Sequence, residues 1–155
     1  QLPWQDVHLA LIDERAVPPT DSQSNERAIG AAFAPVRSRL GAWQGLYAPA
    51  TDLAASARIA DAAIRAFGPL DVTVIGMGAD GHIASLFVES ADYPAAMAPD
   101  TDAAVLPIRF DAGDGRVDRL SFTLAQLLNT RAALFCVTGA VNRRAWRISP
   151  WATSS

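Results

Sequence analysis

The sequence predicts an α/β fold with a mostly parallel sheet and helices on both of its faces. Short apolar runs typical of buried strands occur at residues 7–12, 70–75 and 132–137. A helical pattern over residues 51–67 leads straight into the second run, which gives the strand, helix, strand order of a parallel sheet. With 155 residues, half of them hydrophobic, the chain can bury one sizeable core, so we expect a single domain over residues 1–155.

The N-terminal region is expected to contain one strand, a charged loop and a short helix. Three charged residues follow the run at 7–12 and are expected in the loop at its carboxyl end: Asp13, Glu14 and Arg15. Ser24 and Asn25 can cap a helix, because apolar residues then recur at helical spacing as far as residue 36. Residues 35–50 contain prolines and glycines without a sustained period, which predicts a surface connection.

The clearest helix is expected after Thr51, which can cap it, and before Gly68 and Pro69, which end it. The strand that begins at Leu70 then runs into a turn with three glycines, Gly76, Gly78 and Gly81. Glycine accepts positive φ and lets other groups approach closely, so this composition predicts a tight turn. Residues 83–87 are expected to begin a further helix.

The C-terminal part is expected to alternate loops with two strands. Residues 89–104 are predicted to form a loop, and residues 104–108 an edge strand, because Pro107 cannot donate to a central ladder. A polar turn at 111–118 precedes residues 119–124, and Thr123 can cap a helix that extends to Leu128. Cys136 lies in the last apolar run and is expected to be a buried structural thiol, whereas residues 141–155 show no apolar face and are expected to form a divergent tail.

Composition excludes several classes of function. The net charge of -3 and the absence of a basic stripe argue against a nucleic-acid partner. No run reaches the roughly 18 apolar residues of a membrane span, and the N-terminus has no leader pattern, so we expect a cytoplasmic protein without a membrane partner. The chain begins with Gln1 almost directly before a strand, which suggests that an upstream segment is absent. The residues do not predict an oligomeric state.

Chemistry is expected at the glycine turn, because ligands of α/β proteins bind beyond the carboxyl ends of the strands. Asp80 and His82 lie inside this turn. A histidine suits general base catalysis, and a neighbouring carboxylate can fix its tautomer, although His82 could instead cap a helix or satisfy a buried carbonyl. The three glycines also match a dinucleotide-binding pattern, but such loops keep titratable groups out of the turn. No metal site is expected, since His8 lies mid-strand without ligand spacing to His82.

The segment Gly76-Met77-Gly78-Ala79-Asp80-Gly81-His82-Ile83-Ala84-Ser85-Leu86-Phe87 closely resembles the signature of the 6-phosphogluconolactonases. Other motifs of that family match in order and spacing from Trp4 to Ala140: residues 13–18, the pair Ser24-Asn25, residues 119–124 and residues 137–140. The resemblance implies a Rossmann-like fold of the sugar-phosphate isomerase type. It also implies hydrolysis of 6-phospho-D-glucono-1,5-lactone to 6-phosphogluconate in the oxidative pentose phosphate pathway, without a cofactor.

The resemblance also implies roles for individual residues. His82 would be the base that activates water, Asp80 would orient it, and Asp13 would hold the substrate hydroxyls or the water. Gly78 and Gly81 would shape the loop around the sugar and the developing oxyanion. Donors for the sugar phosphate would come from three side chains: Arg15, Asn25 and Arg119.

Two other interpretations stay open at this point. A glucosamine-6-phosphate deaminase or isomerase shares the Asp-Gly-His loop, although residues 84–87 and 13–15 resemble the lactonase versions more closely. A truncated, non-enzymatic relative is the second, because nothing before Trp4 supplies the family's glycine-rich phosphate loop and Asn142 stands where the family has a lysine.

Overall fold

The computed structural model describes residues 2–110 and 116–139. Its strands are β1 (His8–Ala10), β2 (Asp13–Arg15), β3 (Ala42–Gln44), β4 (Leu70–Gly76), β5 (Val105–Ile108), β6 (Arg119–Phe122) and β7 (Thr130–Cys136). Its α-helices are α1 (Asn25–Phe33), α2 (Leu53–Phe67), α3 (Tyr93–Met97) and α4 (Leu124–Leu128), and two 3-10 helices are η1 (Trp4–Asp6) and η2 (Arg37–Arg39). The expected tail at 141–155 and most of the expected turn at 111–118 lie outside the described residues.

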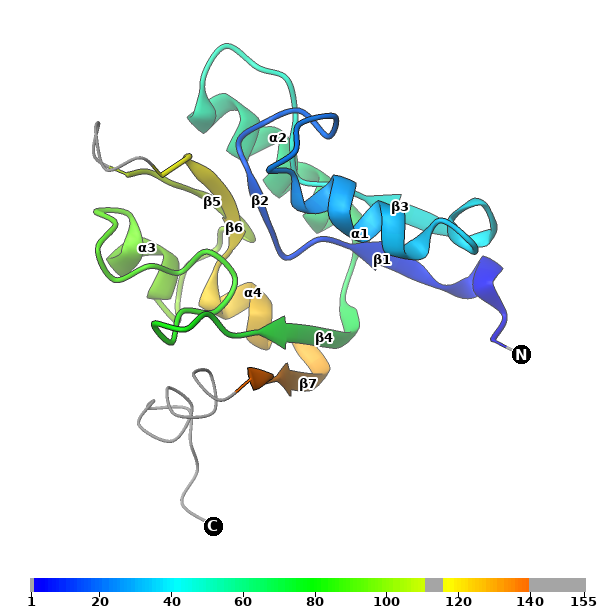
Figure 1. Cartoon of the computed structure of the whole chain (residues 1–155). Helices are drawn as coiled ribbons and strands as arrows, with labels where there is room; N and C mark the ends of the chain where they lie inside the picture. The colour runs from blue at the N-terminus through cyan, green and yellow to red at the C-terminus, as the bar shows by residue number, and fades with distance from the viewer. Residues whose placement is uncertain (1, 111–115, 140–155) are drawn as a thin grey trace.

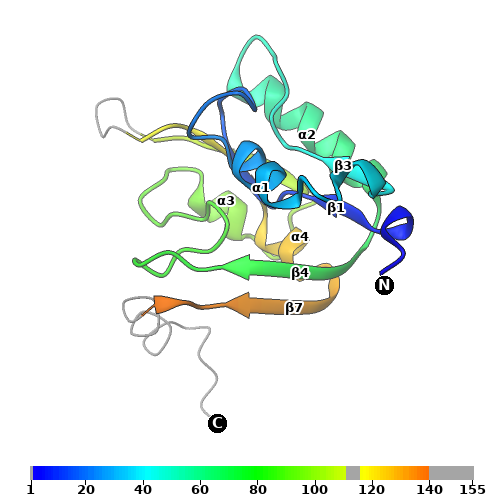
Figure 2. The same ribbon diagram turned by 45° about the vertical axis from the view of Figure 1, so that its right-hand side comes forward.

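The α/β class is confirmed, with the strands divided among three small sheets. Two are parallel pairs, β1 with β3 and β4 with β7, whereas the third is antiparallel in the order β2-β6-β5. Strands β4 and β7 lie side by side on the opposite side of the molecule from α2 (Figures 1 and 2). The β5 strand is at the edge of its sheet, as Pro107 predicts.

Side-chain caps mark where three of the described helices begin, α1, α2 and α4. The side chains of Ser24 and Thr123 accept hydrogen bonds from the backbone in the first turns of α1 and α4, as predicted. The cap of α2 is Asp52 rather than Thr51, because the Asp52 carboxylate accepts from the Ala55 amide at 2.7 Å. Helix α2 buries one face that includes Ala57, Ala60 and Ile64, in agreement with the predicted periodicity.

A single buried cluster joins the helices to the central strands. Its fully buried large side chains include Phe122, Leu120, Ile108, Leu127 and Ile75. Since these residues come from β4, β5, β6 and α4, burial of apolar surface holds the antiparallel sheet against the parallel pair that carries the glycine turn.

Four segments differ from the local prediction. Residues 13–15 form a strand rather than a loop, because their backbone pairs with β6. Residues 42–44 form β3 within the expected connection, and residues 93–97 form α3 within the expected loop. Residues 83–87 do not begin a helix: Ile83 bridges back to Met77, and the backbone then turns through Ala84 at a φ of 48°.

One face of the β4–β7 pair is exposed, although both strands were predicted to be buried. In the parallel register Val72 lies beside Ala132, and Val74 beside Leu134. Val74 is 56% exposed and Leu134 53%. Cys136 shares this face and is an exposed free thiol, which overturns the expected burial. Among the described residues, no helix has the length and apolar character needed to cross a membrane.

Candidate active site

The glycine turn after β4 brings its residues close to one another through backbone hydrogen bonds. The Gly78 amide donates to the His82 carbonyl at 2.9 Å, and the Gly81 amide donates to the Gly78 carbonyl at 3.1 Å. Gly81 has a φ of 91°, which favours glycine. At Gly78 the requirement is space, because a Cβ there would lie 2.6 Å from Asp80 Oδ1 and closer still to the His82 ring.

Asp80 and His82 form the contact that their spacing suggests. The His82 Nδ1 atom lies 2.6 Å from Asp80 Oδ1, and the His82 side chain is one quarter exposed. Burial raises the pKa of Asp80, but the hydrogen bonds and positive charge of His82 outweigh it, so this pKa lies below its ordinary value. Because Asp80 occupies Nδ1, Nε2 is the ring nitrogen that remains for a second partner.

Phe87 connects this pair to the arginines of the antiparallel sheet. Its ring centre lies 3.9 Å from that of His82 and 5.4 Å from the guanidinium carbon of Arg119. Arg119 on β6 is directly opposite Arg15 on β2, and the Arg15 guanidinium donates to the Asn25 side-chain oxygen. The fold therefore gathers residues far apart in sequence around the turn after β4.

The Arg119 guanidinium is partly removed from water among other charges. Its pKa is lowered, first by burial and then by the positive charge of Arg15, while the carboxylates of Asp13 and Glu14 act in the opposite direction. A guanidinium remains protonated under all ordinary conditions, so Arg119 is a permanent cation at this site.

Asp13 is held against the segment that follows His82. The Ser85 hydroxyl donates to Asp13 Oδ2 at 2.8 Å, and the Ser85 amide donates to the Ser121 hydroxyl at 3.1 Å. Both serines are fully buried. These bonds join β2, β6 and the segment that follows the glycine turn, although the residues are up to 108 positions apart in sequence.

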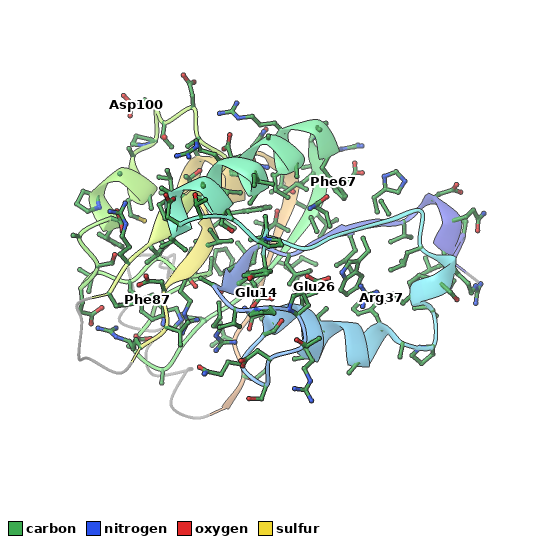
Figure 3. The ribbon with its side chains drawn as sticks, turned by 90° about the horizontal axis from the view of Figure 1, so that it is seen from above. Glu14, Glu26, Arg37, Phe67, Phe87 and Asp100 are labelled. Carbon is green, nitrogen blue, oxygen red and sulfur yellow. The ribbon has the colours of Figure 1, made fainter. Side chains whose placement is uncertain are left out.

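Glu14 organises the start of α1 from a fully buried position. Its carboxylate accepts from the amides of Arg15, Asn25 and Glu26 and from the Ser24 hydroxyl, at 2.6 to 2.9 Å. In the view of Figure 3, Glu14 lies between Phe87 and Glu26. Four donors satisfy the buried charge, and the first turn of α1 thereby fixes Asn25 beside Arg15.

Comparison with known proteins places these features in a family. The model of the family "Glucosamine-6-phosphate isomerases/6-phosphogluconolactonase" matches residues 1–149. The chain belongs to this family. The resemblance derived from the glycine turn and its companion motifs is thus confirmed.

Individual members of the family match over most of the chain. A 6-phosphogluconolactonase of Mesorhizobium japonicum is 33% identical over 144 residues, which are 92% of this chain and 60% of that protein. A 6-phosphogluconolactonase of Caulobacter vibrioides is 34% identical over 91% of this chain and 61% of its own length. The crystal structure of a 6-phosphogluconolactonase from Shewanella baltica superposes with a TM-score of 0.82 at 28% identity, covering 93% of this chain and 60% of that one. The chain therefore spans about three fifths of the length of the curated relatives it matches.

The family motifs include most of the site, but the contacts of three motif residues emerge only from its geometry. Glu14 was expected in a solvated loop, yet it is the fully buried cap of the α1 amides. Ser85 and Phe87 were expected on a helix, yet they contact Asp13 and His82. The sequence carries no signal for this strand, because residues 13–15 are all charged and show no alternation of apolar and polar side chains.

Among residues 2–110 and 116–139, no group of three or more His, Cys, Asp and Glu side chains is placed to hold a metal ion. A hollow of about 550 Å³ lies elsewhere, near Arg65, Ala104 and Gln126, and none of the predicted site residues lines it.

Proposed function

We propose that this chain carries a 6-phosphogluconolactonase site, which hydrolyses the ring ester of 6-phospho-D-glucono-1,5-lactone to 6-phosphogluconate in the oxidative pentose phosphate pathway. The observation that carries the proposal is the position of Phe87, whose ring contacts both the imidazole of the Asp80–His82 pair and the Arg119 guanidinium. A general base and a cation beside one another suit a substrate that is both an ester and an anion. The family membership and the names of its relatives support the same reaction.

In the proposed reaction His82 is the general base. Asp80 holds the proton on Nδ1, so that Nε2 accepts a proton from water as the water oxygen attacks the lactone carbonyl carbon. The tetrahedral oxyanion then collapses, the bond from that carbon to the ring oxygen breaks, and the ring oxygen takes up the proton that Nε2 had accepted from water. The imidazole returns to its starting state, and the product is an open-chain acid.

The remaining site residues would bind and orient the substrate. Arg15 and Arg119 would bind the phosphate, and Asn25 would hold Arg15 in place, because its amide accepts from Arg15 and donates to the Asp13 carbonyl. Asp13 would orient the sugar hydroxyls or the attacking water. Gly78 and Gly81 would keep the loop close enough to surround the oxyanion.

The test is the rate of hydrolysis of freshly generated lactone above its spontaneous background. The parent chain is expected to accelerate hydrolysis, and His82→Ala is expected to abolish the acceleration. His8→Ala is the matched control, because His8 is the only other histidine and packs against Phe67, away from the glycine turn. Equal rates for the parent and His82→Ala would refute the assigned base. Release of ammonia from glucosamine 6-phosphate would favour the deaminase interpretation instead.

A further inference from the structure

The backbone of Ser85 is fixed by hydrogen bonds on both of its sides. The Ser85 amide donates to the Ser121 hydroxyl at 3.1 Å, and that hydroxyl donates in turn to the Phe122 carbonyl at 3.0 Å. The Phe87 amide donates to the Ser85 carbonyl at 3.1 Å, and Ser85 is fully buried. Both backbone polar groups of Ser85 are therefore engaged, so its hydroxyl is the group that can act on another residue.

The acceptor of the Ser85 hydroxyl is the Asp13 carboxylate, whose Oδ2 atom lies 2.8 Å away. Asp13 is half-buried on β2 and directly opposite Ser121 on β6. The three residues thus form a closed loop of contacts, in which the pairing of β2 with β6 determines where the Ser85 hydroxyl meets Asp13. A hydrogen bond to an ionised carboxylate is stronger than one between neutral groups, so this contact restricts the orientation of the Asp13 side chain.

Asp13 has cationic neighbours that compete for its carboxylate. Burial lowers the pKa of Arg119 and the charge of Asp13 acts in the opposite direction, so these two groups lie within electrostatic range of one another. Arg15 is on the same strand as Asp13. A carboxylate and a guanidinium attract each other in a partly buried site. Yet in the part of the chain that the structure describes, no ion pair joins Asp13 to either arginine, and the carboxylate accepts from Ser85 instead.

We propose that Ser85 is a positioning residue, which holds the Asp13 carboxylate out of an ion pair with Arg119 and oriented toward the substrate. The inference rests on the proposed function, in which Asp13 orients the sugar hydroxyls or the attacking water. Without the Ser85 hydroxyl, the Asp13 carboxylate would turn toward Arg119 and neutralise a cation that is expected to bind the substrate phosphate. Because Ser85 acts only through Asp13, its loss should have little effect once the carboxylate itself is removed.

The experiment is a double-mutant cycle on hydrolysis of the phosphorylated lactone, in which Ser85→Ala, Asp13→Ala and the double variant are compared at equal folded fraction. Ser85→Ala is expected to lower kcat/KM about tenfold in the parent and less than about twofold in the Asp13→Ala background. The loss should fall in the same parameter, kcat or KM, that Asp13→Ala changes. Ser56→Ala is the matched control and should keep the parent kcat/KM, because Ser56 is a buried serine on α2 whose hydroxyl bonds to the Ala48 backbone.

Each outcome decides the inference separately from the proposed function. If the parent is active and Ser85→Ala lowers kcat/KM equally in both backgrounds, or not at all, the inference is overturned while the lactonase assignment stands. If the parent shows no hydrolysis, the proposed function fails. In that case, or where Asp13→Ala is too slow to measure, calorimetry with 6-phosphogluconate carries the same cycle. Weaker binding to Ser85→Ala that disappears in the Asp13→Ala background supports the inference, whereas additive losses, unchanged binding or the absence of binding overturn it.

Discussion

The Ser85 hydroxyl donates to the Asp13 carboxylate at 2.8 Å and so connects the segment after His82 to β2. Replacement of Ser85 by alanine leaves a partly buried carboxylate oxygen without this donor, and we expect a loss of about 1 to 3 kcal/mol in the free energy of unfolding. Urea denaturation measures the loss. Ser38→Ala is the control, since Ser38 is exposed on η2. Equal losses for both variants would show that the Asp13 contact contributes nothing specific.

The close approach of Gly78 to His82 predicts a sharp difference between two glycines of the same segment. Gly78→Ala places a Cβ against the His82 ring and Asp80 Oδ1, so the pair must move, and we expect lactone hydrolysis to fall about a hundredfold. Gly76→Ala has no heavy atom within 4 Å of the new Cβ and should retain the parent rate. The two rates are compared at equal folded fraction, and similar rates would contradict the assigned geometry.

The buried carboxylate of Glu14 predicts a large effect of an uncharged replacement. In Glu14→Gln an amide nitrogen would face N–H and O–H donors that now meet a carboxylate oxygen, so we expect a loss of about 3 kcal/mol in stability. Asp71→Asn, at a carboxylate whose side chain is 81% exposed, should change stability by less than about 0.5 kcal/mol. Unfolding in urea distinguishes the two, and a fully stable Glu14→Gln chain would refute the prediction.

The environment of Asp61 should make the free energy of unfolding depend on pH. Its carboxylate accepts from the amides of Ala104 and Val105 and from Arg65, and it joins α2 to β5. Burial raises the pKa of Asp61, but the hydrogen bonds from Arg65 and the two amides outweigh it, so the folded value lies below the ordinary 3.8. A lowered pKa means that the stabilisation is present above the unfolded value and is lost as pH falls through the folded one.

Asp61→Asn should accordingly be less stable than the parent at neutral pH, and the difference should shrink as pH falls below about 4. Urea unfolding at a series of pH values measures the difference in free energy. Asp100→Asn serves as the control, because Asp100 is exposed at the periphery of the molecule (Figure 3). If the difference in unfolding free energy between the parent and Asp61→Asn stays constant with pH, the assigned titration of Asp61 is wrong.

Contacts between residues near in sequence were predictable, and those that depend on strand register were not. Asp80 and His82 are two residues apart in sequence, and Ser24 and Thr123 each cap an amide three residues later. The local sequence pattern was therefore sufficient to predict these contacts. The Arg15–Arg119 juxtaposition depends on the antiparallel register of β2 and β6. The family motifs indicated both arginines, but only the register brings them together.

Tertiary contacts overrode local preference where the prediction was wrong. Residues 83–87 read as a helix start, but the bridge from Ile83 to Met77 and the bonds of Ser85 hold them in a turn. The apolar run at 132–137 suggested two buried faces, whereas β7 has no buried residue: Phe135 is half-buried against the core, and Cys136 is exposed on the other face. An apolar run cannot by itself tell a strand covered on one face from a strand covered on both.

The Glu14 carboxylate accepts four hydrogen bonds, and this affects how readily such a site could change its ligand. A helix N-terminus commonly holds anions through backbone amides, which no substitution removes. Here the protein's own carboxylate occupies the first amides of α1, so in the proposed function the side chains of Arg15 and Arg119 would bind the phosphate instead. Substitution of these arginines alone would then change the preference for phosphorylated over unphosphorylated lactones, while the Asp80–His82 pair on the glycine turn stayed intact.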